Sequence, residues 1–189
     1  IITSQIVSFD SNKFDTNGML LSSIALPSIE NQALDIFVSR FTYFFPEDCF
    51  VGKKIGLYEH SSVARGLLKT ILEHLGADVL LLGFSPEFVS VDTEAIRAED
   101  IKLARHWMAE YDLDSIVSTD GDGDRPLVSD EHGIWLNGDV VGILTAKYLG
   151  IESIVTPISS NTVVEKCVFF DTVIRTKIGS PYVIEAMNE

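Results

Sequence analysis

Three carboxylates, those of Asp120, Asp122 and Asp124, alternate with two glycines directly after an apolar stretch of the sequence. In an extended strand, alternate side chains lie ~6.6 Å apart, at ~3.3 Å rise per residue. The ligands of one Mg²⁺ must each come within ~2.1 Å of the ion, which a straight strand does not allow. Because glycine tolerates unusual φ values, the two glycines let this segment curl and bring the carboxylates together.

Such convergence is unfavourable unless a cation is present. Two unit charges ~5 Å apart repel each other by roughly 3 kcal/mol at an effective dielectric constant near 20. A solvated acidic turn is the alternative interpretation, because Asp and Gly are both common turn residues. The segment follows a predicted strand of an α/β sheet, however, and the carboxyl ends of such strands are where ligands usually bind. We therefore predict a divalent metal site formed by the three carboxylates.

Two other types of acidic loop agree less well with the sequence. An EF-hand calcium loop needs Asp at positions 1, 3 and 5, Gly at position 6 and Glu at position 12. Counted from Asp120, the carboxylates fit and Glu131 falls at position 12, but Arg125 occupies position 6 and the flanks are predicted strands. A haloacid-dehalogenase-type phosphotransferase would have Thr or Val two residues after its second Asp, where this chain has Asp124.

Strand and helix patterns alternate on both sides of the acidic segment. Apolar periodicity and turn residues predict helices at 31–45, 62–75, 98–111, 139–149 and 162–168, and strands at 54–58, 79–82, 115–118, 126–128, 134–136, 153–156 and 172–175. This alternation predicts an α/β fold in three layers, with a mainly parallel or mixed sheet covered by helices on both faces.

The chain divides into three predicted segments. Residues 1–30 are polar connecting chain or the remnant of an upstream domain, with a short strand expected at 6–9. Residues 31–150 form a metal-binding α/β domain, and residues 151–189 form the incomplete start of a further α/β domain. Since the chain opens on Ile1 and stops just after a turn and an amphipathic start, we expect it to be a piece of a longer protein.

The amino-acid composition limits the classes of molecule that the chain is expected to bind. The chain has 189 residues, with 14 basic and 28 acidic side chains and a net charge of −14. This balance argues against nucleic acid or a membrane surface, and no apolar run approaches the ~20 residues that cross a bilayer. Cys49 and Cys167 have no metal-like spacing and no secretory signal is visible, which predicts free thiols and a cytoplasmic location.

Several ordered segments resemble one enzyme family. The hexad Asp120-Gly-Asp-Gly-Asp-Arg125 resembles the metal-binding loop of the α-D-phosphohexomutases, the phosphomannomutase/phosphoglucomutase enzymes. Segments 56–65, 75–78 and 137–140 are similar to the second domain of those enzymes, and 175–183 to an early part of the third. The resemblance covers roughly residues 31–189 and is closest to bacterial phosphomannomutase-type sequences.

The resemblance implies a reaction and roles for individual residues. A phosphoserine would exchange its phosphoryl group with a hexose 1- or 6-phosphate through a bisphosphorylated intermediate. Asp120, Asp122 and Asp124 would hold Mg²⁺, Arg125 would contact phosphate and Lys177 would lie near the reaction centre, with no organic cofactor. The implied partners are a mannose or glucose phosphate and the remaining domains of the parent chain, and a second copy of this chain is a further candidate.

Parts of the family pattern have no match in this sequence. The Thr-Ala/Gly-Ser-His motif of the nucleophilic serine is absent, and His60 precedes rather than follows Ser61. The hydroxyls of Ser61 and Ser62, near a predicted helix start, are expected to accept backbone N–H groups instead. The sugar-binding loop is also absent, so the sequence does not indicate which hexose phosphate is preferred. The chain alone is expected to be inactive. The alternative function is a non-enzymatic α/β module that binds a divalent ion.

Overall fold

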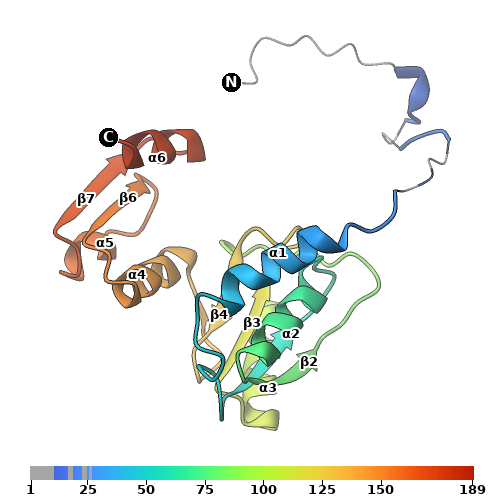
Figure 1. Ribbon diagram of the computed structural model, residues 1–189, viewed down its shortest axis with the longest axis horizontal. Helices are drawn as coiled ribbons and strands as arrows, with labels where there is room; N and C mark the ends of the chain where they lie inside the picture. Colours follow the sequence, from blue (N-terminus) through green and yellow to red (C-terminus); the bar gives the residue numbers. More distant parts are fainter. Residues whose placement is uncertain (1–10, 17–18, 23–24, 26) are drawn as a thin grey trace. The chain divides into compact units, whose positions relative to one another are not determined.

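A computed structural model describes residues 11–16, 19–22, 25 and 27–189 of the protein (Figure 1). The chain separates into two compact units, residues 1–36 and 37–189. The first contains a short 3₁₀ helix, η1 (Ser11–Lys13), and an isolated bridge between Phe14 and Leu20. The strand expected at 6–9 lies outside the described residues.

The second unit contains the alternating elements that the sequence predicts. Helix α1 (Asn31–Thr42) leads into it and ends three residues before the predicted limit. The unit continues with β1 (Lys54–Tyr58), α2 (Arg65–His74), β2 (Asp78–Leu82), α3 (Ala98–Tyr111), β3 (Ser115–Thr119), β4 (Pro126–Ser129), β5 (Trp135–Leu136), α4 (Gly138–Tyr148), β6 (Ser153–Pro157), α5 (Val163–Lys166), β7 (Thr172–Thr176) and α6 (Ser180–Met187). Two further predicted helices are also too long, because α2 begins three residues late and α5 is a single turn.

A five-stranded mixed sheet in the order β2-β1-β3-β4-β5 forms the centre of this unit. Strand β1 pairs in parallel with β2 and β3, whereas β4 and β5 add as an antiparallel hairpin. Because β2 and β3 lie on opposite sides of β1, right-handed crossovers through α2 and α3 place these two helices on opposite faces. The predicted α/β fold with helices on both faces of a mixed sheet is confirmed.

Strand β1 is buried on both faces of the sheet. Ile55 and Leu57 point to one face, and α2 packs on β1 and β2. On the opposite face, a Cβ at Gly56 would lie only 2.7 Å from Leu82 Cδ1, and the Tyr58 ring lies 5.1 Å from that of Trp107 in α3. The core on the α3 face consists of Tyr58, Leu82, Val91, Ala104, Trp107, Met108, Leu113, Ile116, Leu127 and Trp135.

A buried carboxylate ties α3 to the sheet. The Asp100 side chain has no exposed surface and accepts hydrogen bonds from Arg97 Nε at 2.7 Å, Arg97 Nη2 at 2.8 Å and the Tyr58 hydroxyl at 3.1 Å. Burial, followed by the charge of Asp100, raises the pKa of Tyr58 to about 12. Trp135 Nε1 donates to the Asp100 carbonyl, so the first turn of α3 joins β1 to β5.

The C-terminal elements form a second, two-stranded parallel sheet of β6 and β7, with α6 packed on both strands. Arg175 in β7 organises the neighbouring loop, donating to the carbonyls of Pro157 and Ser160 and pairing with Glu165 at 2.7 Å. Asp139 in α4 accepts the N–H of Asn161 at 2.8 Å, which links α4 to the same loop. In the described part of the chain, no helix is long and apolar enough to span a membrane.

Replacing Asp100 with Ala is expected to lower the free energy of unfolding by about 3 kcal/mol, measured by urea denaturation. The variant leaves the Tyr58 hydroxyl buried without its acceptor and the Arg97 guanidinium without its partner. Because Arg97 is partly exposed, the loss of stability lies at the low end of the range for broken buried ion pairs. The matched control is Glu99→Ala, exposed in the same turn and expected within about 0.5 kcal/mol of the parent chain. Equal stability of the two variants would contradict the assigned role of Asp100.

Candidate metal centre

The acidic loop, residues 120–125, follows β3 at the carboxyl end of the sheet, where β3 lies beside β1. After β1 the chain turns towards β2, and after β3 it turns towards β4 on the other side. Connections that diverge from neighbouring parallel strands leave a crevice at their carboxyl ends, which is the usual ligand site of such sheets. The topology therefore places the loop at the position where an α/β sheet binds ligands.

The loop brings its three carboxylates together, as the alternation with glycine predicts. Ligand oxygens of Asp120, Asp122 and Asp124 all lie within 4.8 Å of one another. Asp120 Oδ1 accepts the N–H groups of Gly123, Asp124 and Arg125 at 3.0, 3.1 and 3.3 Å. Gly123 has a φ of +81°, which permits the curl. The flanking elements are β3 and β4 rather than two helices, which excludes the EF-hand alternative.

The pKa values of the carboxylates show how the loop tolerates its own charge. Burial opposes ionisation of Asp120, but hydrogen bonds from Asp124 and from the backbone N–H groups of the loop hold its pKa below the usual value. The hydrogen bond to Asp120 raises the pKa of Asp124, and burial and the charge of Asp122 add to this rise. The two carboxylates thus lie close enough for each to shift the pKa of the other. Three converging hard oxygen donors fit a divalent cation such as Mg²⁺ in the same place.

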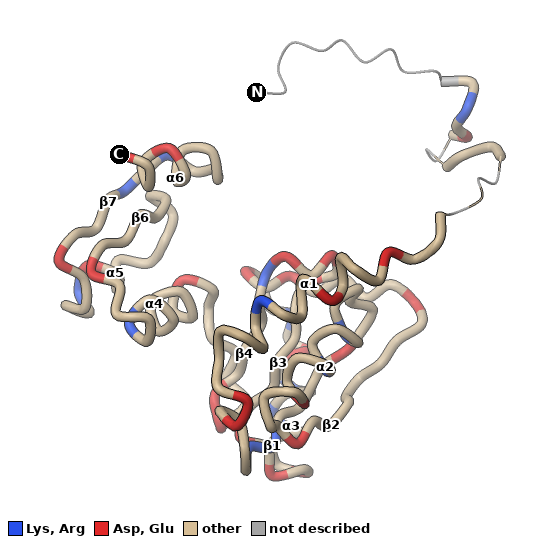
Figure 2. Tube along the Cα trace, viewed as in Figure 1, with Lys and Arg blue, Asp and Glu red and all other residues tan. Residues whose placement is uncertain are grey.

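Arg125 is the cation beside this cluster, in a chain where Lys and Arg are sparse (Figure 2). Its guanidinium pairs with Glu94 at 3.6 Å and with Asp120 and Asp124 at 3.9 Å each. The side chain is 55% exposed and its ion pairs are long, so its planar set of donors is accessible from solvent. Pairing with the acidic loop is therefore observed, and phosphate contact stays a prediction.

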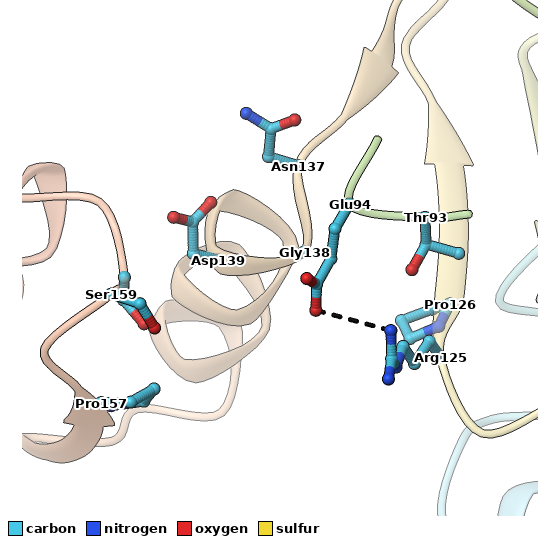
Figure 3. A pocket seen from close by; sticks show the side chains of 10 residues that line it. Thr93, Glu94, Arg125, Pro126, Asn137, Gly138, Asp139, Pro157 and Ser159 are labelled. Atoms are coloured by element: carbon cyan, nitrogen blue, oxygen red, sulfur yellow. Dashed lines mark ion pairs between the residues drawn. The ribbon is translucent and has the colours of Figure 1, made fainter. Parts of the chain in front are cut away.

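A cavity of about 600 Å³ lies next to Arg125. Three groups of residues line it (Figure 3): those beside the acidic loop, those at the start of α4 and those after β6, namely Thr93, Glu94, Arg125 and Pro126, residues 137–139, and residues 157, 159 and 160.

Lys177 is not among the residues that line this cavity. It is exposed after β7, with its Nζ 5.4 Å from the centre of the Tyr182 ring. Its predicted place near a reaction centre thus receives no support from this cavity and stays a prediction.

The loop after β1 braces the acidic loop, and sequence reasoning did not assign this role. The two serines accept backbone N–H groups: Ser61 Oγ that of Val89 at 2.8 Å, and Ser62 Oγ that of Ala64 at 3.1 Å. Neither caps the helix as predicted, because α2 begins at Arg65 without a side-chain cap. Val63 N–H donates across to Gly121 O at 3.1 Å. The fully buried His60 also contacts β3, through Nε2 and the Thr119 carbonyl at 2.9 Å. The adjacency of two predicted parallel strands was the only sequence signal for this brace.

Comparison with known proteins agrees with this architecture. Residues 50–133 match the model for the phosphoglucomutase/phosphomannomutase alpha/beta/alpha domain II. A phosphomannomutase from Salmonella muenchen is 49% identical over 150 residues, covering 79% of this chain and 31% of the relative. One from Sinorhizobium fredii is 47% identical over 159 residues, covering 84% of this chain and 33% of the relative.

A crystal structure of a phosphoglucomutase/phosphomannomutase family protein from Burkholderia thailandensis supports the fold. Its TM-score is 0.70 at 18% identity, over 82% of this chain and 35% of that one. Fold and loop thus define an α/β domain that presents a carboxylate triad at the opening of its sheet. Residues 50–133 thus match domain II of the phosphoglucomutase/phosphomannomutase family, and the chain is similar to two phosphomannomutases over most of its length. It spans about a third of the length of the curated relatives it matches.

Titration of the chain with Mg²⁺ or Mn²⁺ is expected to give weak, saturable binding that Asp122→Asn weakens about tenfold, a loss of about 1.4 kcal/mol. Asp122 is the informative position because it is exposed, whereas Asp120 also holds the backbone of the loop through three hydrogen bonds. Glu131→Gln removes the same charge from an exposed position in the next turn and is expected to leave the affinity unchanged. Equal binding by both variants would refute the metal assignment.

Proposed function

We propose that this chain is the metal-binding part of a Mg²⁺-dependent, cytoplasmic hexose-phosphate mutase of the phosphomannomutase type. The whole protein would interconvert a sugar 6-phosphate and 1-phosphate through a phosphoserine and a bisphosphorylated intermediate. The observation that carries this proposal is the converged triad of Asp120, Asp122 and Asp124, which lies within the segment that matches domain II. The 47–49% identity to two phosphomannomutases supports the substrate class.

Each part of the loop has a task in this proposal. Asp120, Asp122 and Asp124 would hold Mg²⁺, which supplies positive charge to stabilise the phosphoryl group in transfer. The guanidinium of Arg125, lying beside the triad and next to the cavity, would bind a phosphate with its planar set of donors. Glu94 also pairs with Arg125, at Nη1, and would limit its movement. Lys177 is proposed as a second cation near the reacting group.

The rest of the chain would connect this centre to the other domains of the protein. Residues 31–150 would form the metal-binding domain, 151–189 the start of the next α/β domain and 1–30 the link to an upstream one. Two hydroxyls, of Ser159 and Ser160, line the cavity near Arg125 and would contact a phosphorylated hexose there. The nucleophilic serine and the sugar-binding loop would come from outside this chain, because their motifs are not found in it.

A coupled assay with mannose 1-phosphate or glucose 1-phosphate, Mg²⁺ and the 1,6-bisphosphate activator tests the proposal. The complete reading frame is expected to show turnover that Asp122→Ala reduces to background and that Glu131→Ala leaves intact. The 189-residue chain alone is expected to read at background, because covalent transfer needs an activated nucleophile and an oriented sugar. Turnover by the short chain would place the nucleophile within it, with Ser61 and Ser118 the first residues to replace.

A further inference from the structure

His60 combines two unfavourable features in one residue. Its imidazole is fully buried, and within the described part of the chain its Nδ1 has no hydrogen-bond partner. Its backbone φ is +30°, in the region that side chains other than glycine rarely occupy. A buried acceptor without a donor and a positive φ both lower stability. Neither feature is needed to form β1, which ends at Tyr58. The residue therefore contributes something other than stability of the strand.

The other ring nitrogen of His60 makes a single specific contact. Nε2 lies 2.9 Å from the carbonyl oxygen of Thr119, the last residue of β3 and the one before Asp120. Because a carbonyl oxygen can only accept, Nε2 must carry the proton and donate it. The contact thus fixes the tautomer with the proton on Nε2, which leaves Nδ1 as the unpaired acceptor.

The Thr119 carbonyl needs this donor because of the sheet topology. Asp120 N–H donates to Arg125 O at 3.2 Å on the β4 side, so the carbonyl one residue earlier points to the β1 side. There the pairing of β1 with β3 has already ended at Leu57 and Val117. The N–H of Glu59 lies on the other side of β1, where it donates to Leu82 O of β2 at 2.9 Å. The imidazole of His60 takes the place of the missing backbone donor.

A second contact holds the same backbone. Ser62 Oγ lies 2.7 Å from Thr119 Oγ1, which in turn donates to the Asp120 carbonyl at 2.8 Å. Since the Thr119 hydroxyl gives its proton to Asp120, Ser62 must donate to Thr119. Two residues of the loop after β1 thus hold Thr119: His60 contacts its carbonyl oxygen and Ser62 contacts its hydroxyl. Ser118 Oγ also lies 3.3 Å from the Thr119 carbonyl oxygen, but it makes its shorter hydrogen bond, at 2.6 Å, to Tyr58 O.

We propose that His60 is a positioning residue for the metal centre: its Nε2–H group holds the Thr119 carbonyl and thereby sets the direction in which Asp120 enters the loop. The inference rests on the proposed role of this loop as a divalent-cation site. Removing the donor frees the peptide before Asp120, so the carboxylates converge less well. Cation affinity then falls while the domain stays folded.

The test is titration of the 189-residue chain with Mn²⁺, with free Mn²⁺ followed by electron paramagnetic resonance. His60→Phe keeps a buried ring without a donor and is expected to weaken binding about tenfold, the usual scale for residues that orient metal ligands. In His60→Gln, an amide N–H can reach the Thr119 carbonyl and is expected to restore most of the affinity. Ile71→Val, a core change in α2, lowers stability and is expected to leave the affinity unchanged.

Thermal unfolding shows which variants are folded at the titration temperature. If His60→Phe does not fold, His60→Asn decides, because Asn tolerates positive φ but is too short to reach Thr119, and the same loss is expected. Unchanged affinity in a folded variant without the donor, or equal losses in His60→Phe and His60→Gln, would overturn the inference. If Asp122→Asn weakens binding and His60 variants do not, only the role of His60 fails; if Asp122→Asn has no effect, the cation site itself fails.

Discussion

Repulsion between three carboxylates within 4.8 Å of one another is the constraint on which the rest of this structure depends. A flexible loop would relieve that repulsion by separating the charges. Here the loop is held closed by the bonds that its own backbone N–H groups donate to Asp120, and the strand before it is paired on both sides. The rigidity of β3 therefore keeps the carboxylates converged, in the arrangement that the proposed cation site needs.

The order of the strands decides where this cluster lies. Because β1 leads to β2 and β3 leads to β4, the connections separate at the carboxyl edge and leave it open. The same separation removes β1 as a hydrogen-bond partner just where β3 still has a carbonyl to satisfy. Side chains from the loop after β1 fill that gap. The same strand order therefore has two consequences: it leaves the carboxyl edge of the sheet open, and it leaves the end of β3 in need of a side-chain hydrogen-bond donor.

Local patterns predicted the elements and the triad, because the information for both lies within short segments. Helix α3 matches its predicted bounds, and alternating Asp and Gly was sufficient to predict that the acidic side chains converge. His60 was not predicted, because its role depends on which strands are neighbours and on the residue at which β1 ends. The pairing of Arg125 with Glu94 was missed for a similar reason, since Glu94 lies in an irregular loop between β2 and α3. Register and loop path arise from tertiary structure, which periodicity does not contain.

A positive φ alone does not mark a functional position in this protein. Asp112 and Val168 also have φ values of +51°, but each follows a helix, at the C-cap of α3 or just after α5, where left-handed residues commonly end helices. His60 differs because its positive φ follows a strand, its ring is fully buried, and one nitrogen lacks a partner while the other contacts Thr119, the residue before the acidic loop. A residue that combines several destabilising features is usually kept because the contact it makes serves a functional site rather than the stability of the fold. The structure satisfies that condition at the carboxyl edge between β1 and β3, where the sequence also places its three carboxylates.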